Sequence, residues 1–76
     1  MNKIRRAELQ KIYDTLSDTL ESLEILKEEE EAYLDSIPEN MQGSERYEKA
    51  EEAVSSLEGS ISSIEEACSS IEEAMQ

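Results

Sequence analysis

The side chains that most readily do chemistry are scarce, because the 76 residues include one cysteine and no histidine. Without histidine, the usual zinc-ligand sets and the Cys-His or Ser-His catalytic pairs are absent. Cys68 lies between Ile64 and Ile71 among acidic neighbours that disfavour a thiolate, so we expect it to pack as a small apolar side chain. Glu30 is a lone carboxylate on an apolar stripe, where a metal site would need several. The sequence therefore predicts no enzyme, no metal site and no cofactor.

Basic side chains are concentrated at two places in a chain whose net charge is −13. Residues 1–11 carry four basic residues against one acid, net +3, whereas residues 12–76 carry three against 19, net −16. One interpretation is compensation, in which Arg5 and Arg6 lie beside the glutamates of 65–73 while Arg46 and Lys49 lie beside the acids of 28–35. The other is that two packed copies bring these basic ends together into a tyrosine-lined pocket for a phosphate and a base.

The pocket hypothesis assigns a role to each kind of side chain. Arg5 and Arg6 would neutralise phosphate, Arg46 would bind it through its planar fork, and Tyr47 would stack on the base. The full set of predicted ligand-binding residues is Arg5, Arg6, Tyr13, Asn40, Gln42, Arg46, Tyr47 and Lys49.

One stretch of turn chemistry, residues 36–44, divides the chain into two elements. Pro38 removes a backbone N–H and disfavours a helical residue before it, so it ends the first helix near Asp35 and suits the start of a short turn. Gly43 is expected to close that turn in the left-handed conformation, and Ser44 to cap the second helix. The sequence predicts one helical hairpin over 1–76, with helices at about 2–35 and 45–75, and the short connection makes them antiparallel.

Apolar residues recur at helical spacing on both sides of the turn, and the second half follows a seven-residue repeat. The predicted stripe of the first helix is Leu9, Ile12, Leu16, Thr19, Leu23, Leu26, Glu30, Tyr33 and Ile37, with Tyr13, Leu20 and Leu34 forming a second edge. The predicted stripe of the second helix is Tyr47, Ala50, Val54, Leu57, Ile61, Ile64, Cys68, Ile71 and Met75, with Ala53, Ala67 and Ala74 beside it.

The extra edges predict self-association, because a two-helix hairpin has only one helix-helix contact and a chain of this size seldom folds without disulfides, metals or oligomerisation. We expect an all-α, antiparallel two-helix coiled-coil hairpin that oligomerises, as a dimer or higher assembly, into a helical bundle.

Charge and hydropathy also limit the partners. A net charge of −13 disfavours direct binding of nucleic acid, but an acidic rod can imitate one and occupy a partner's binding groove. No apolar run exceeds the three residues 32–34, so we expect no membrane span, no signal peptide and a cytoplasmic setting.

The central segment, residues 37–48 (IPENMQGSERYE), followed by Ser/Ile/Glu/Glu/Ala heptads, resembles short uncharacterised proteins encoded by phages and mobile elements of Gram-positive bacteria. The resemblance implies a phage-derived protein in a bacterial host, without a defined activity. Small acidic oligomeric phage proteins are often counter-defence factors that sequester nucleotide immune signals between subunits, or that mimic nucleic acid to block a host defence protein. We lean toward sequestration, and the mimic and a structural coiled-coil adaptor remain alternatives.

Overall fold

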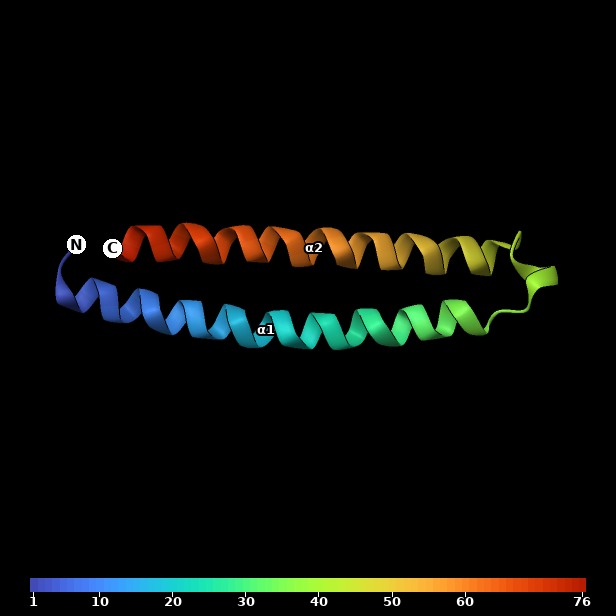
Figure 1. Cartoon of the computed structure of the whole chain (residues 1–76), viewed down its shortest axis with the longest axis horizontal. Helices are drawn as coiled ribbons and strands as arrows, with labels where there is room; N and C mark the ends of the chain where they lie inside the picture. The colour runs from blue at the N-terminus through green and yellow to red at the C-terminus, as the bar shows by residue number, and fades with distance from the viewer.

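The computed structural model describes all residues 1–76 as two long helices that pack against each other (Figure 1). Helix α1 spans Lys3–Ser36, a single 3₁₀ turn η1 spans Glu39–Met41, and helix α2 spans Glu45–Met75. The chain forms a rod of 59 × 15 × 13 Å in which the helices run antiparallel and both termini lie at one end. Neither helix has the length and apolar character needed to cross a membrane. The fold is all-helical and hairpin-like, as the sequence predicts.

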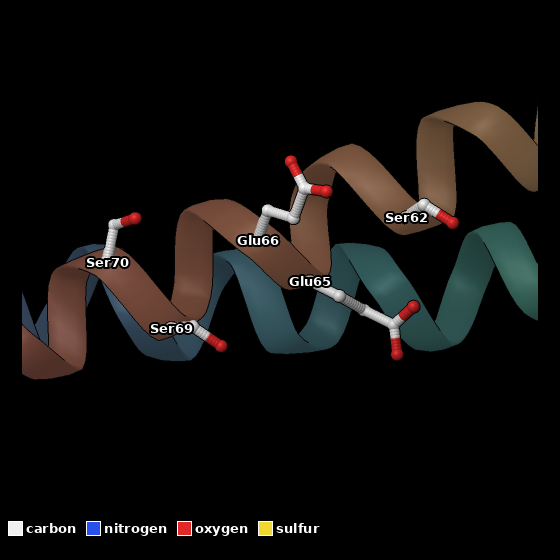
Figure 2. Close-up of a pocket in the computed structure, with 5 residues that line it drawn as sticks. All are labelled: Ser62, Glu65, Glu66, Ser69 and Ser70. Atoms are coloured by element: carbon white, nitrogen blue, oxygen red, sulfur yellow. The ribbon is translucent and has the colours of Figure 1, made fainter.

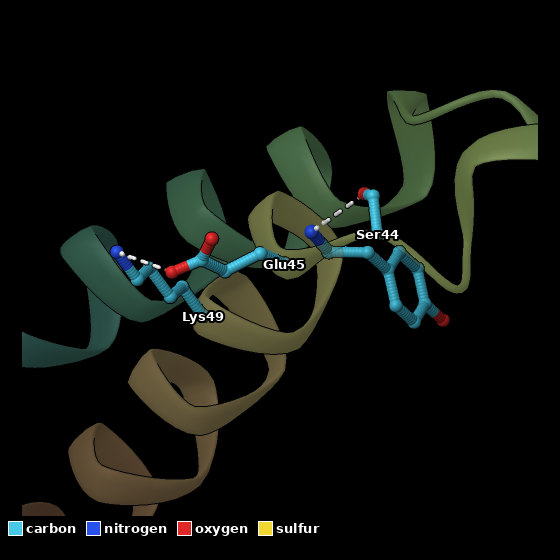
Figure 3. A network of polar contacts seen from close by, with 4 residues as sticks. Ser44, Glu45 and Lys49 are labelled. Carbon is cyan, nitrogen blue, oxygen red and sulfur yellow. Dashed lines mark hydrogen bonds and ion pairs between the residues drawn. The ribbon is translucent and has the colours of Figure 1, made fainter.

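Each long helix begins at a polar cap. The Asn2 side chain accepts a hydrogen bond from the Arg5 backbone N–H at 2.7 Å, and the Ser44 hydroxyl accepts one from the Tyr47 N–H at 3.2 Å (Figure 3). These bonds satisfy N–H groups that the first helical turn leaves without partners. The predicted Ser44 cap is confirmed, while the Asn2 cap was not anticipated.

The connection between the helices contains no left-handed residue. Pro38 precedes η1 and its carbonyl accepts the Met41 N–H at 2.8 Å, while the Met41 carbonyl accepts the Ser44 N–H at 3.1 Å. No residue of the chain has a positive φ, so the expected left-handed conformation of Gly43 is wrong. Consecutive short-range bonds reverse the chain, and glycine's conformational freedom is not needed there.

Helix α2 presents the predicted stripe to α1. Ala50, Ile61 and Cys68 are buried, and the other stripe residues are half-buried. Cys68 is a free, buried thiol in this stripe, which agrees with its predicted packing role.

Helix α1 meets α2 along a stripe whose phase differs from the predicted one. Ile12, Thr19 and Leu26 were predicted on the stripe facing the second helix, but Ile12 and Leu26 are 51% and 52% exposed, and Thr19 is exposed as well. The predicted second edge faces inward in their place. The half-buried or buried stripe is Leu9, Tyr13, Leu16, Leu20, Leu23, Lys27, Glu30, Leu34 and Ile37.

This stripe advances in regular steps of four and three residues, the spacing that keeps one side of a helix against a straight partner. It carries Lys27 inward, which is tolerated because the long side chain lies along the contact and reaches Glu31 at 3.5 Å. At its end it buries Ile37, only 7% exposed, beneath the turn. With this phase, α1 keeps a continuous stripe against α2 from Leu9 to Ile37.

Candidate functional site

Five of the predicted ligand-binding residues lie at the turn end of the rod. The Arg46 guanidinium donates a hydrogen bond to the Tyr33 hydroxyl and lies over the Tyr33 ring, with 5.5 Å between the guanidinium carbon and the ring centre. Tyr47 is half-buried in the α2 stripe, so its ring packs within the hairpin. Lys49 pairs with Glu45 at 3.3 Å (Figure 3). Asn40 and Gln42 are exposed, and their side chains make no hydrogen bond within the chain.

The other three predicted residues lie at the end that carries the termini. Arg6 donates to the Met75 carbonyl at 2.8 Å and to the Met1 carbonyl at 3.1 Å, so it ties the two ends of the chain together. The Tyr13 hydroxyl donates a hydrogen bond to a carboxylate oxygen of Glu72. The Arg5 guanidinium is exposed and makes no ion pair.

The two groups are separated by most of the length of a 59 Å rod. One hairpin therefore cannot bring them together around a single small molecule, and a pocket that used both would need a second copy.

The compensation interpretation places basic residues beside acids of the facing helix, but no ion pair crosses the hairpin. The ion pairs are Lys27–Glu31 and Lys49–Glu45, and each joins neighbours within one helix. Across the hairpin, the basic and tyrosine side chains use neutral groups or hydrogen bonds instead. Arg46 contacts a phenol, Arg6 contacts a carbonyl, and Tyr13 contacts the carboxylate of Glu72. Apart from Glu45 and the half-buried Glu31, the acids have no cationic partner within the chain.

The Tyr13 phenol has a pKa that its partner on the facing helix shifts. Its hydrogen bond to Glu72, followed by the negative charge of that carboxylate, raises the pKa of the Tyr13 phenol above its ordinary value of 10.0. The neutral phenol is therefore the form that the folded hairpin favours.

The glutamates next to the stripes lie on one side of the rod, along α2 and along the turn half of α1. They recur every seven residues, about 10.5 Å along a helix, so they stay on the same side of each helix. All are exposed apart from a half-buried Glu31. We call this the acidic side, and its members are Glu24 and Glu31 of α1 with Glu51, Glu58, Glu65 and Glu72 of α2.

The opposite flank carries no acid. The contact between Tyr33 and Arg46 fixes which residues face one another there, and seven-residue steps along both helices give the other pairs. We call this the acid-free side. Its pairs are Arg5 with Ala74, Ile12 with Ala67, Thr19 with Ser60, Leu26 with Ala53, and Tyr33 with Arg46.

A shallow polar depression on the outer surface of α2 is lined by Ser62, Glu65, Glu66, Ser69 and Ser70 (Figure 2). It has no apolar lining, and the carboxylates of Glu65 and Glu66 point away from each other. No group of three or more acidic or sulfur ligands in the chain is arranged to hold a metal ion. The depression offers carboxylates and hydroxyls to solvent and has no means of enclosing a small molecule.

Sequence reasoning missed the contrast between the two sides. The signal was present, since the residue before each α2 heptad is Arg46, Ala53, Ser60, Ala67 or Ala74 and is never an acid. Finding it required the true phase of α1, which brings Ile12, Thr19 and Leu26 to the same flank. No protein-family model matches the chain significantly, and neither does any curated protein or solved structure.

Proposed function

We propose that this protein is a non-enzymatic binding protein whose acidic side occupies a basic, nucleic-acid-binding surface of a partner protein. The observation that carries the proposal is that the acidic side has only one cation beside it, Lys27 at Glu31, and none along α2. Glu51, Glu58 and Glu65 make neither an ion pair nor a hydrogen bond, although basic residues are available elsewhere in the chain. Carboxylates kept free in a regular row are suited to the Lys and Arg side chains of another protein.

The charge density supports an imitation of single-stranded nucleic acid. A net charge of −13 over 59 Å is one charge per about 4.5 Å, against one per 3.4 Å along a single DNA strand and one per 1.7 Å along the duplex. The rod thus carries a linear charge comparable to one strand, on a scaffold that is straight and only 13–15 Å wide. A groove that holds one strand by its phosphates is the kind of surface that it fits.

The test is affinity capture from a bacterial lysate on the immobilised protein, followed by elution with single-stranded DNA. We expect the captured proteins to be basic, to elute with the oligonucleotide, and to be lost as the salt concentration rises, because interactions between exposed charges are screened. The variant Glu58→Gln with Glu65→Gln removes two charges from the acidic side and should lower the yield severalfold.

The matched control is Glu8→Gln with Glu29→Gln, which removes two exposed charges that are not part of the acidic side. Equal loss of capture in both variants, or proteins that stay bound in excess single-stranded DNA, would contradict the proposal. Capture that ignores charge and salt would favour the structural adaptor.

A second candidate, sequestration of a small nucleotide signal, has one observation in its favour. The Arg5 guanidinium is unpaired and lies on the same acid-free side as Arg46. A second copy could bring these two guanidinium groups near one phosphate. Native mass spectrometry with cyclic oligonucleotides and NAD-derived signals tests this candidate. Bound ligand that disappears in Arg5→Ala and in Arg46→Ala would support it, and an assembly that stays empty would count against it.

The resemblance to phage-encoded proteins leads us to expect a host defence protein as the target of either activity. That expectation remains a prediction, and the identity of the captured protein or the bound nucleotide is what tests it.

A further inference from the structure

The acid-free side is unusual for this chain because Asp and Glu make up 20 of its 76 residues, yet none of its ten positions is acidic. The neighbouring row on α2 extends it, with Lys49 followed by serines at 56, 63 and 70. The two flanks of the hairpin therefore differ sharply, although both are exposed to solvent in a single copy.

Large apolar side chains of α1 are exposed on this side. Ile12 and Leu26 are 51% and 52% exposed on this side, whereas the exposed Ile4 and Ile25 lie farther round, on the outermost row of α1. The facing positions of α2 are small, since Ala67 lies opposite Ile12 and Ala53 lies opposite Leu26. The middle of the surface thus consists of a ridge on α1, made of Ile12, Thr19 and Leu26, and a row of alanine and serine on α2.

The exposed surface area of one hairpin is larger than that of an average folded monomer of the same mass. One chain exposes 5613 Å², whereas a folded monomer of 8.6 kDa exposes about 4,700 Å² by the usual scaling with mass. The excess of about 900 Å² is close to the roughly 800 Å² that each partner buries in a stable protein-protein interface. Only four residues are buried in the single hairpin, so its own core is thin.

Charge determines which side a second copy can use. Two chains of −13 repel each other, and packing through the acidic side would bring rows of glutamate within a Debye length of about 8–10 Å. Packing through the acid-free side keeps both acidic sides on the outside, at opposite surfaces of the assembly. It also lets the ridge of one copy and the alanines of the other share one apolar layer.

We propose that the acid-free side is the interface through which two copies of this chain pack, face to face about a twofold axis, into a four-helix bundle. The ridge and the row of small residues belong to the same surface, so the surface is complementary to itself. A twofold axis along the rods sets α1 of one copy against α2 of the other, so the ridge meets the row of small residues and every helix stays antiparallel to its neighbours.

Sedimentation equilibrium over about 1–100 µM tests the proposal on the full chain. The wild type should have twice the chain mass of 8.6 kDa. Ala67→Glu places a charge in the apolar layer and should weaken self-association by at least a hundredfold, giving the single-chain mass while the helical circular dichroism signal persists. Ala67 is exposed in the hairpin, so the added glutamate leaves the α1–α2 contact intact.

Ser62→Glu is the matched control, since it adds the same charge to an exposed α2 position away from the acid-free side. It should keep the dimer mass. A wild-type monomer at 100 µM, or equal weakening by both substitutions, would overturn the proposal.

A second variant tests the interface without relying on disruption. Thr19→Ile, at the centre of the acid-free side, should tighten self-association about tenfold by adding apolar surface to the layer. Ser17→Ile makes a similar change near the acidic side and should leave the association unchanged. Equal effects of the two substitutions would overturn the assignment of the surface.

The proposed capture of a basic partner is measured separately, so a monomeric chain that still binds through its glutamates would reject only the dimer.

Discussion

The Tyr13–Glu72 hydrogen bond gives a residue-scale dependence on pH. The raised pKa of Tyr13 means that the folded chain holds the phenol proton more tightly than the unfolded chain, so the stabilisation is fully present below about pH 10 and is lost as the pH rises through the folded pKa. Deprotonation would place a phenolate beside a carboxylate.

We therefore expect part of the phenolate absorbance to develop above the ordinary tyrosine pKa of 10.0, and Tyr13→Phe to remove that part. The wild type should also lose stability more steeply above pH 10 than the variant. Identical pH profiles of phenolate absorbance per tyrosine in the two proteins would contradict the assignment.

The contact between Arg46 and Tyr33 is the second residue-scale feature, because it joins the helices at the turn end. Arg46→Ala should lower the free energy of unfolding by about 0.5–1 kcal/mol, the usual size of an exposed cation–π contact. Lys49→Ala removes an exposed ion pair within one helix and should change the free energy of unfolding by less than about 0.5 kcal/mol. Urea unfolding of both variants measures the difference, and equal effects would show that Arg46 acts only as a surface charge.

At the scale of the elements, neither glycine of the chain has a backbone conformation that requires glycine, so we expect both to tolerate alanine. Gly59 lies inside α2, and a Cβ added there would meet nothing within 4 Å, so Gly59→Ala should stabilise the chain by about 1 kcal/mol through helix propensity. Gly43 also has free space and no positive φ, so Gly43→Ala should stabilise by about 0.4–1 kcal/mol through the unfolded state. Thermal unfolding measures both, and destabilisation by Gly43→Ala would indicate the left-handed turn that the structure lacks.

Comparison of the two helices shows which kinds of sequence pattern determine structure. The α2 stripe was predictable because Val54, Leu57, Ile61 and Ile64 follow a single seven-residue repeat with serines and glutamates between them. In α1, Ile12 and Tyr13, and likewise Thr19 and Leu20, offer two adjacent phases that local periodicity cannot separate. Only the packed partner decides between them, through contacts such as Tyr13 with Glu72.

The candidate binding residues were less predictable for the same reason. Arg6 and Arg46 were identified correctly as basic residues at the helix starts, but their contacts with a carbonyl and a phenol depend on the facing helix. The acid-free side depends on the phase of both helices at once, so it follows only from the packed hairpin.

At the scale of the whole molecule, the charge of −13 and the proposed dimer make a joint prediction for thermal stability. Only two ion pairs are present, and both are exposed at least in part. Added salt therefore screens mainly the repulsion among the excess carboxylates and little attraction between opposite charges. Raising the salt concentration from 0.01 to 1 M shortens the Debye length from about 30 Å to about 3 Å. The Debye length is then much smaller than the width of the rod, whereas at low salt it exceeds that width. The unfolding temperature should therefore rise with salt.

The unfolding temperature should also rise with protein concentration, because unfolding is coupled to dissociation of a dimer. Ala67→Glu separates the two effects, since its unfolding temperature should still rise with salt but should no longer depend on concentration. A wild-type unfolding temperature that falls as salt is added would mean that attraction between opposite charges holds the assembly together, and the acid-free side would then lose the electrostatic argument that favours it as the interface.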